Sequence, residues 1–205
     1  MATFLRQLEV MANDALTYSL LFGSYREPAL GRRVLCFLQS QLQARGHTVH
    51  VLDAAAHNLP LFGQMYKEFD PGEAPAPLPH FANCLESSDG IVLVAGEYNH
   101  SIQPGLKNLL DLFQSEFLWR IAALCTYSPG QFGGMRNAMH LRAMCGELGM
   151  PTISSIFGIP AANKKLQEDG ANPDGDLLPF CERYLNELDW YAQALRAQRQ
   201  QGTPF

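Results

Sequence analysis

Short, mostly apolar runs alternate along the chain with segments whose apolar residues recur at helical spacing. Five of these runs have the length and pattern of buried strands. They span residues 18–22, 48–53, 91–95, 121–127 and 152–156. The helical spacing predicts helices at about 34–45, 81–87, 104–117, 137–148 and 177–198. Buried strands that alternate with helices predict a parallel sheet between two helical layers.

The chain is predicted to form one domain preceded by a short extension. We expect residues 1–16 to be this N-terminal extension and residues 17–200 to be a single domain. Residues 63–79 hold several prolines and a glycine, which exclude a helix interior or a central strand. We interpret them as a surface loop, because too little chain precedes them to form a separate domain. Residues 160–176 are polar and rich in turn residues.

Five strand–helix units with right-handed crossovers leave few possible topologies. We expect an α/β, flavodoxin-like three-layer sandwich, whose five-stranded parallel sheet has the order 2-1-3-4-5. In this order strands 1 and 3 flank the point where the strand order reverses, and ligands bind at the carboxyl ends of the strands. The loops after strands 1, 3 and 4, at residues 23–33, 96–105 and 128–136, should therefore meet at one site.

The first of these loops, GSYREPALGRR, has the features of an anion site. Gly23 allows a sharp turn, Ser24 offers a hydroxyl, and the helix that follows directs its free amides toward the loop. Arg26 can add a charge-assisted hydrogen bond to a phosphate oxygen. A strand-to-helix turn with solvated arginines is the alternative interpretation. Neither GxGxxG nor GxxxxGK[ST] occurs, which argues against the dinucleotide-binding and P-loop classes.

The second and third loops suggest a site for a planar ring. Gly96 permits close approach of the backbone, Tyr98 supplies a flat face, and Asn99 can pair with the amide edge of a heterocycle. A hydrogen-bonded turn that caps the next helix would use the same residues. The third loop, SPGQFGGMR, offers backbone amides free of bulky side chains, although a long turn would also suit this composition.

Composition excludes several other classes of function. The net charge of −5 gives no basic surface for nucleic acid. No apolar run reaches the roughly 20 residues that span a bilayer, and the N-terminus is a poor secretory signal. The five cysteines show no CxxC spacing, so we expect reduced thiols and a cytoplasmic location. His47 and His50 would face opposite sides of a strand, so we expect no metal site. No GxSxG motif is present, which argues against hydrolysis by a serine on a nucleophile elbow.

The three loops together resemble those of the NADPH-dependent FMN reductases, flavodoxin-like enzymes that include quinone, chromate and azo-dye reductases. The family's phosphate loop, GSxR…G, is matched by Gly23, Ser24, Arg26 and Gly31. Its PEYNxS…P..LKNAID motif is matched by GEYNHSIQPGLKNLLD, in which Gly96 replaces the usual proline. Its third motif is matched by GGMRNAMHLRAMCGELG. The resemblance covers roughly residues 18–160.

This resemblance implies a single FMN-binding domain over residues 17–200, with FMN as cofactor and NADPH or NADH as cosubstrate. The implied phosphate-binding residues are Ser24, Arg26, Leu30 and Gly31. The implied contacts to the flavin ring are Glu97, Tyr98, Asn99, His100, Ser128, Gly130 and Gly133. Residues that would hold the second loop or aid oligomer packing are Lys107, Asn108 and Asp111. No catalytic side chain is expected, because the cofactor carries the chemistry.

The expected reaction passes hydride from the nicotinamide to bound FMN and then to a small-molecule electron acceptor. A quinone, free flavin, azo dye or metal oxyanion could be this acceptor. The resemblance also implies a homodimer or homotetramer. From the charge and the apolar runs described above, we expect neither nucleic acid nor membrane as a partner. Two alternatives are a flavodoxin-type electron carrier, and a flavin-free regulatory or assembly protein of the same fold. Flavin uptake, and bleaching of that flavin by NADPH, would distinguish the three.

Overall fold

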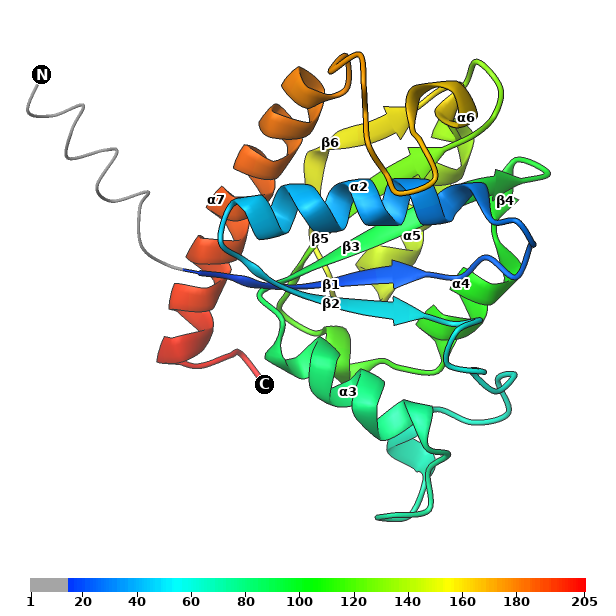
Figure 1. The fold of residues 1–205 in the computed structure, drawn as a ribbon. Coiled ribbons are helices and arrows are strands. Elements are labelled where there is room, and N and C mark those ends of the chain that lie inside the picture. Colours follow the sequence, from blue (N-terminus) through cyan, green and yellow to red (C-terminus); the bar gives the residue numbers. More distant parts are fainter. Residues whose placement is uncertain (1–14) are drawn as a thin grey trace, which may run out of the picture.

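A computed structural model describes residues 15–205, so most of the predicted extension 1–16 lies outside the described residues. Its centre is a sheet of five parallel strands in the order β2-β1-β3-β5-β6 (Figure 1). These strands are β1 (Thr17–Phe22), β2 (Thr48–Asp53), β3 (Gly90–Tyr98), β5 (Ile121–Tyr127) and β6 (Thr152–Ile159). The predicted order 2-1-3-4-5 is confirmed. A two-residue strand, β4 (Ser101–Ile102), adds an antiparallel pairing to the end of β3.

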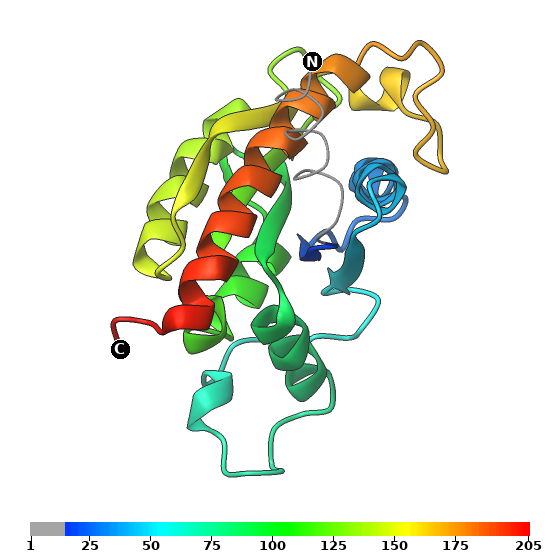
Figure 2. The same ribbon diagram turned by 90° about the vertical axis from the view of Figure 1, so that its left-hand side faces the viewer.

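Helices cover both faces of the sheet. One face carries α2 (Leu30–Ala44) and α7 (Leu178–Gln201), and the other carries α3 (Pro77–Ser87), α4 (Pro104–Asp111) and α5 (Met135–Glu147). The short α6 (Ala162–Lys165) contacts α2. Figure 2 shows α7 running alongside β6. No helix within residues 15–205 is long and apolar enough to cross a membrane.

Alternating side chains of each strand enter the two cores. In β3, Val92 and Val94 pack with α2 and α7, whereas Ile91, Leu93 and Ala95 pack with α3, α4 and α5. All five side chains are fully buried. This explains the continuous apolar run in the sequence, because a strand covered on both faces needs apolar residues at every position.

Several predicted boundaries differ from the observed ones. Helix α3 begins at Pro77, inside the predicted surface loop 63–79, because proline is tolerated in the first turn of a helix. A 3₁₀ turn, Tyr66–Glu68, lies in the same segment. Strand β6 continues to Ile159 rather than ending at residue 156, and the segment predicted as turns, 160–176, includes α6.

The helix predicted over residues 104–117 is also shorter than expected. Helix α4 ends at Asp111, and a separate 3₁₀ turn spans Ser115–Phe117. Phe113 and Phe117 are nevertheless buried, with their rings in edge-to-face contact. The apolar periodicity therefore predicts the burial of Phe113 and Phe117 correctly, although the helical backbone ends at Asp111.

Candidate functional site

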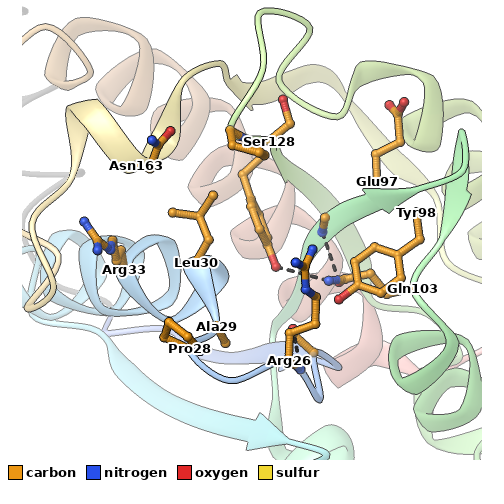
Figure 3. A pocket seen from close by; sticks show the side chains of 14 residues that line it. Arg26, Pro28, Ala29, Leu30, Arg33, Glu97, Tyr98, Gln103, Ser128 and Asn163 are labelled. Atoms are coloured by element: carbon orange, nitrogen blue, oxygen red, sulfur yellow. Dashed lines mark hydrogen bonds between the residues drawn. The ribbon is translucent and has the colours of Figure 1, made fainter.

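The loops after β1, β3 and β5 line one cavity of about 310 Å³ at the carboxyl ends of these strands (Figure 3). The adjacent strands are in parallel register up to this edge, with Phe22 beside Val94 and Gly96 beside Tyr127. The cavity walls come from Ser24, Arg26, Pro28, Ala29, Leu30, Arg33, Gly96, Glu97, Tyr98, Gln103, Tyr127, Ser128, Pro129 and Asn163. The strand order thus brings together the three loops that the sequence identified.

The cavity contains part of the predicted set of site residues. The predicted residues that line it are Ser24, Arg26, Leu30, Glu97, Tyr98 and Ser128. The predicted residues outside its lining are Gly31, Asn99, His100, Gly130 and Gly133. Asn99 and His100 form the exposed two-residue turn between β3 and β4, with φ angles of 51° and 62°. This left-handed backbone is typical of tight hairpins.

Helix α2 presents its N-terminus to the cavity. Ala29 and Leu30 at this end line the wall, and no side chain of the described residues caps the helix. The first amides of a helix have no acceptor within the helix, and the helix dipole adds partial positive charge there. This end of the cavity is therefore suited to an anion.

The arginines of the first loop have different surroundings. Arg32 Nη1 lies 3.0 Å from Asp53 Oδ2, and Arg33 Nη1 donates to the carbonyl of Leu166 at 2.9 Å. The guanidinium of Arg26 has no hydrogen-bond or ion-pair partner within residues 15–205 and lines the cavity. Arg26 is thus exposed at the cavity, as the interpretation of a turn with solvated arginines also expects, whereas Arg32 and Arg33 contact other parts of the chain. Arg33 lines the cavity as well.

Two side chains hold the peptide groups of Gly96 in place. The Gly96 N–H donates to Gln103 Oε1 at 3.0 Å, and Asn137 Nδ2 donates to the Gly96 carbonyl at 2.9 Å. Gln103 Nε2 also donates to Tyr127 Oη at 3.2 Å. Gln103 and Asn137 are both buried. The strand that faces the cavity is thus fixed from α5 and from the residue preceding α4.

The hydroxyl of Tyr98 is buried at the cavity and has no hydrogen-bond partner among the described residues. A buried hydroxyl without a partner costs about 1–3 kcal/mol, so such groups are rare in native proteins. Nearby, burial raises the pKa of Tyr127 above its ordinary value, so this second hydroxyl stays protonated. Tyr98 Oη is thus a polar group at the cavity whose hydrogen-bonding capacity no described residue uses.

Glu97 connects the second loop to the glycine-rich third loop. The Arg136 backbone N–H donates to Glu97 Oε2 at 3.1 Å, and Arg136 Nη1 donates to Oε1 at 3.2 Å. Arg136 is in the first turn of α5, where a carboxylate is favoured by the helix dipole. Its guanidinium also lies 4.2 Å from the centre of the Phe132 ring. The two loops therefore form one wall.

Lys107, Asn108 and Asp111 follow the second loop on α4, and none of them lines the cavity. Asn108 Oδ1 accepts from the Phe62 N–H at 2.7 Å, and Asn108 Nδ2 donates to the Pro60 carbonyl at 2.8 Å. Lys107 and Asp111 form an ion pair one turn apart on α4. Asn108 thus holds the segment that follows β2.

Sequence reasoning missed four polar groups of the site: Arg33, Gln103, Tyr127 and Asn163. Arg33 and Gln103 lie in the first and second loops, at positions that the motifs do not specify, whereas Tyr127 ends β5 and Asn163 belongs to α6. For Arg33 and Gln103, the available signal was their place in these loops. Within residues 15–205, no group of three or more His, Cys, Asp or Glu side chains is placed to hold a metal ion. The cavity offers aromatic walls, an uncapped helix end and fixed amides, which suit a planar polar ring attached to an anion.

Known proteins share this architecture. Residues 18–164 match the family described as NADPH-dependent FMN reductase. A quinone reductase of Pseudomonas putida is 23% identical over 190 residues, covering 90% of this chain and 99% of that protein. A 2-hydroxy-1,4-benzoquinone reductase of Burkholderia sp is 28% identical over 192 residues, with coverages of 90% and 99%. The structure of FerB, a flavoenzyme NAD(P)H:(acceptor) oxidoreductase from Paracoccus denitrificans, has the same fold. Its TM-score is 0.71 at 20% identity, covering 89% of this chain and 98% of that one.

Proposed function

Because the chain belongs to the NADPH-dependent FMN reductase family, we propose that it binds FMN in the cavity at the ends of β1, β3 and β5. It is an oxidoreductase of that family, with FMN as cofactor and NADPH or NADH as cosubstrate. The acceptor that we propose is a quinone, and a free flavin, an azo dye or a metal oxyanion could replace it. When bound, FMN supplies a ring that takes a hydride from nicotinamide and releases the electrons to the acceptor.

The observation that carries the proposal is the buried, unpartnered hydroxyl of Tyr98 in the same cavity as the uncapped N-terminus of α2. A flavin mononucleotide has a ring with polar edges at one end and a phosphate at the other. The ring can supply a partner for Tyr98, and the phosphate can accept from the amides of α2. The residues present therefore fit FMN.

The protein contributes binding and orientation. Gln103 and Asn137 fix Gly96, so the backbone beside the ring cannot shift to accommodate a different geometry. Glu97 holds the first turn of α5 against the end of β3. Ser128 is held at the wall by backbone hydrogen bonds with Ile159 and Ala162. Interactions arranged before the ligand arrives reduce the ordering cost of binding.

The choice of a quinone follows from the relatives. Curated proteins that align over almost their whole length are named quinone reductase and 2-hydroxy-1,4-benzoquinone reductase. A quinone is flat and can stack where the nicotinamide leaves. At identities of 23% and 28%, a shared acceptor does not follow from the similarity alone, so the quinone is a proposal for this chain.

We propose a homodimer or homotetramer located in the cytoplasm. Large apolar side chains are exposed on the loops after β1, β2 and β5 and on α5: Tyr25, Leu61, Phe62, Phe132, Met135 and Met139. Exposed apolar side chains that form one contiguous patch mark a subunit contact, and we propose that role for these. All five cysteines are free thiols, as expected in a reducing compartment. Light scattering with size-exclusion chromatography tests the oligomer.

The central test uses the purified protein and added FMN. We expect FMN absorbance to be retained on desalting and to bleach when NADPH or NADH is added anaerobically. Addition of a quinone should then restore it. Bound FMN that neither nicotinamide bleaches would instead indicate an electron carrier. Failure to retain FMN would contradict the proposal and would favour a flavin-free role for the fold.

A further inference from the structure

We propose that a second cavity, between β6 and the N-terminal part of α7, binds a small aromatic carboxylate whose ring carries a hydroxyl group. The cavity has a volume of about 470 Å³, and none of its lining residues lines the cavity assigned to FMN. Small-molecule sites in proteins have volumes of about 300–1,000 Å³. The inference is independent of the proposed function, because it concerns a different part of the molecule.

The second cavity lies beside the edge strand of the sheet (Figure 1). Strand β6 pairs with β5 on one side and with no other strand of the described residues. Residues 155–158 of β6 form one wall, and three side chains of α7 form another. The segment 160–176, which is polar and rich in turn residues, contributes most of the remaining lining. A strand, a helix and a loop segment thus border this space.

The walls carry several aromatic side chains. Phe157 and Tyr184 are buried, with their ring centres 5.6 Å apart. Phe180 comes one helical turn before Tyr184, lines the same cavity and is 71% exposed. Side chains four residues apart lie on the same face of a helix, so Phe180 continues this aromatic surface toward solvent. A flat ring that stacks on this surface would remove Phe180 from water.

Arg183 gives the second cavity an unbalanced positive charge. The two other charged groups of the lining, Lys165 and Asp176, form an ion pair with each other. The hydrogen bond from Lys165 holds the pKa of Asp176 below its ordinary value, so the two charges cancel at neutral pH. The Arg183 guanidinium has no hydrogen-bond or ion-pair partner within residues 15–205. Its planar donors match a carboxylate, which would balance the charge.

Tyr184 supplies a second polar group to this cavity. The residue is 2% exposed, and its hydroxyl is buried with no hydrogen-bond partner among the described residues. Burial holds the pKa of this hydroxyl well above its ordinary value, so it stays protonated and can donate. A buried hydroxyl without a partner is rare in native proteins, because its desolvation is not compensated. A hydroxyl group on the ligand ring can supply the missing partner.

The test compares 4-hydroxybenzoate with benzoate, which has the same ring and carboxylate and no hydroxyl. Affinities are measured by NMR titration of the backbone amides of residues 155–158, with FMN at saturation and again without added flavin. We expect a Kd of about 1 mM or below for 4-hydroxybenzoate, and about three- to tenfold weaker binding of benzoate. Arg183→Gln should weaken both ligands by about tenfold. Tyr184→Phe should leave benzoate binding unchanged and remove the preference for 4-hydroxybenzoate.

Lys164→Gln is the matched control, because it removes an exposed positive charge next to Lys165 and outside the cavity lining. It should leave both affinities unchanged. No response of residues 155–158 in the wild type, or equal losses in Arg183→Gln and Lys164→Gln, would overturn the proposal. So would a preference for 4-hydroxybenzoate that persists in Tyr184→Phe.

The two flavin conditions separate this site from the first cavity. Titration responses that FMN abolishes would place the ligands in the flavin cavity and would also overturn the proposal. A protein that does not bind FMN would contradict the proposed function alone, because the titration without flavin still reports on residues 155–158. Thermal unfolding of each variant without ligand checks that it folds.

Discussion

The hydroxyl of Tyr127 occupies the space that a side chain at Gly31 would fill. A Cβ atom at position 31 would lie 2.0 Å from Tyr127 Oη and 2.4 Å from its Cζ. Gly31 therefore serves the site by leaving room for a cavity wall, although it does not line the cavity itself. Because Gly31 on α2 has no side chain, the Tyr127 side chain on β5 can occupy this space.

Gly31→Ala should disturb both stability and the cavity. Tyr127 is buried and hydrogen-bonded to Gln103, so it cannot move away without loss. We expect the free energy of unfolding to fall by about 1–3 kcal/mol, as in other overpacked cores. FMN affinity should fall with it. Urea denaturation and FMN titration measure the two effects.

Gly146→Ala is the matched control, since Gly146 lies in α5 and a Cβ atom there would meet no neighbouring described atom within 4 Å. Replacing a helical glycine by alanine in open space should raise stability by about 0.5–1 kcal/mol. If both alanine variants had the same effect, steric exclusion by Tyr127 would not be the cause.

Gln103→Leu should destabilise the protein by removing the acceptor of the Gly96 N–H. The buried amide would then lack a partner, at a cost of about 1–3 kcal/mol. Gln103→Glu keeps an acceptor for Gly96, and the O–H of its protonated carboxyl can replace the donor to Tyr127 Oη. We expect chemical denaturation to show a smaller loss for the glutamate variant at a pH that keeps this buried carboxyl protonated, because a buried carboxylate carries a desolvation cost. The exposed Gln43→Leu should be nearly neutral. A Gln103→Leu protein as stable as wild type would contradict the role of Gln103 in holding the Gly96 N–H.

Tyr98→Phe should have opposite effects on stability and on ligand binding. Removing a buried hydroxyl that has no partner should stabilise the ligand-free protein by about 1 kcal/mol. Removing the partner of a flavin atom should weaken FMN binding by about three- to tenfold. Thermal unfolding without ligand and fluorescence titration with FMN measure the two changes.

Tyr184→Phe separates these effects, because the Tyr184 hydroxyl is also buried without a partner among the described residues and does not line this cavity. It should show the gain in stability with unchanged FMN affinity. Identical FMN titrations for the two phenylalanine variants would mean that Tyr98 makes no polar contact with the flavin.

Acid should remove stability through Asp189. Burial raises the pKa of this carboxyl, but the adjacent His47 ring and the hydrogen bonds from Tyr18 and Arg45 outweigh it and hold the pKa below the usual 3.8. A carboxyl with a depressed folded-state pKa stabilises the fold above its unfolded-state pKa, and this contribution is lost as pH falls through the folded-state pKa. Unfolding free energies measured from pH 7 down to about 2 should therefore fall below about pH 4.

Asp189→Asn should lower stability at pH 7 and flatten this acid dependence, whereas Asp174→Asn on the surface should do neither. Arg45 Nη1 also lies 2.8 Å from Asp189 Oδ2, so the asparagine variant removes the negative charge that faces this guanidinium. An unchanged slope between about pH 4 and the folded-state pKa in Asp189→Asn would show that other carboxyls cause the loss.

Much of the second loop was predictable, but the orientation of its side chains was not. The motif identified Glu97 and Tyr98, which line the cavity, together with Asn99 and His100, which do not. Strand β3 continues through Tyr98 and then reverses into β4. The positive φ angles at Asn99 and His100 belong to this reversal and place both residues at its exposed tip. The pairing of β4 with β3 involves only two residues, too few to leave a periodic signal.

The sequence by itself determined the layers of this protein, the order of its parallel strands and the edge where the site lies. These follow from local apolar patterns and from the rules that govern crossover connections. Only the tertiary structure decided which side chains face the cavity. The cavity lining includes Arg33 from α2, Tyr127 from β5, Asn163 from α6 and Gln103 from the residue between β4 and α4. Their contacts depend on packing between residues far apart in the chain, as the space left by Gly31 for Tyr127 illustrates.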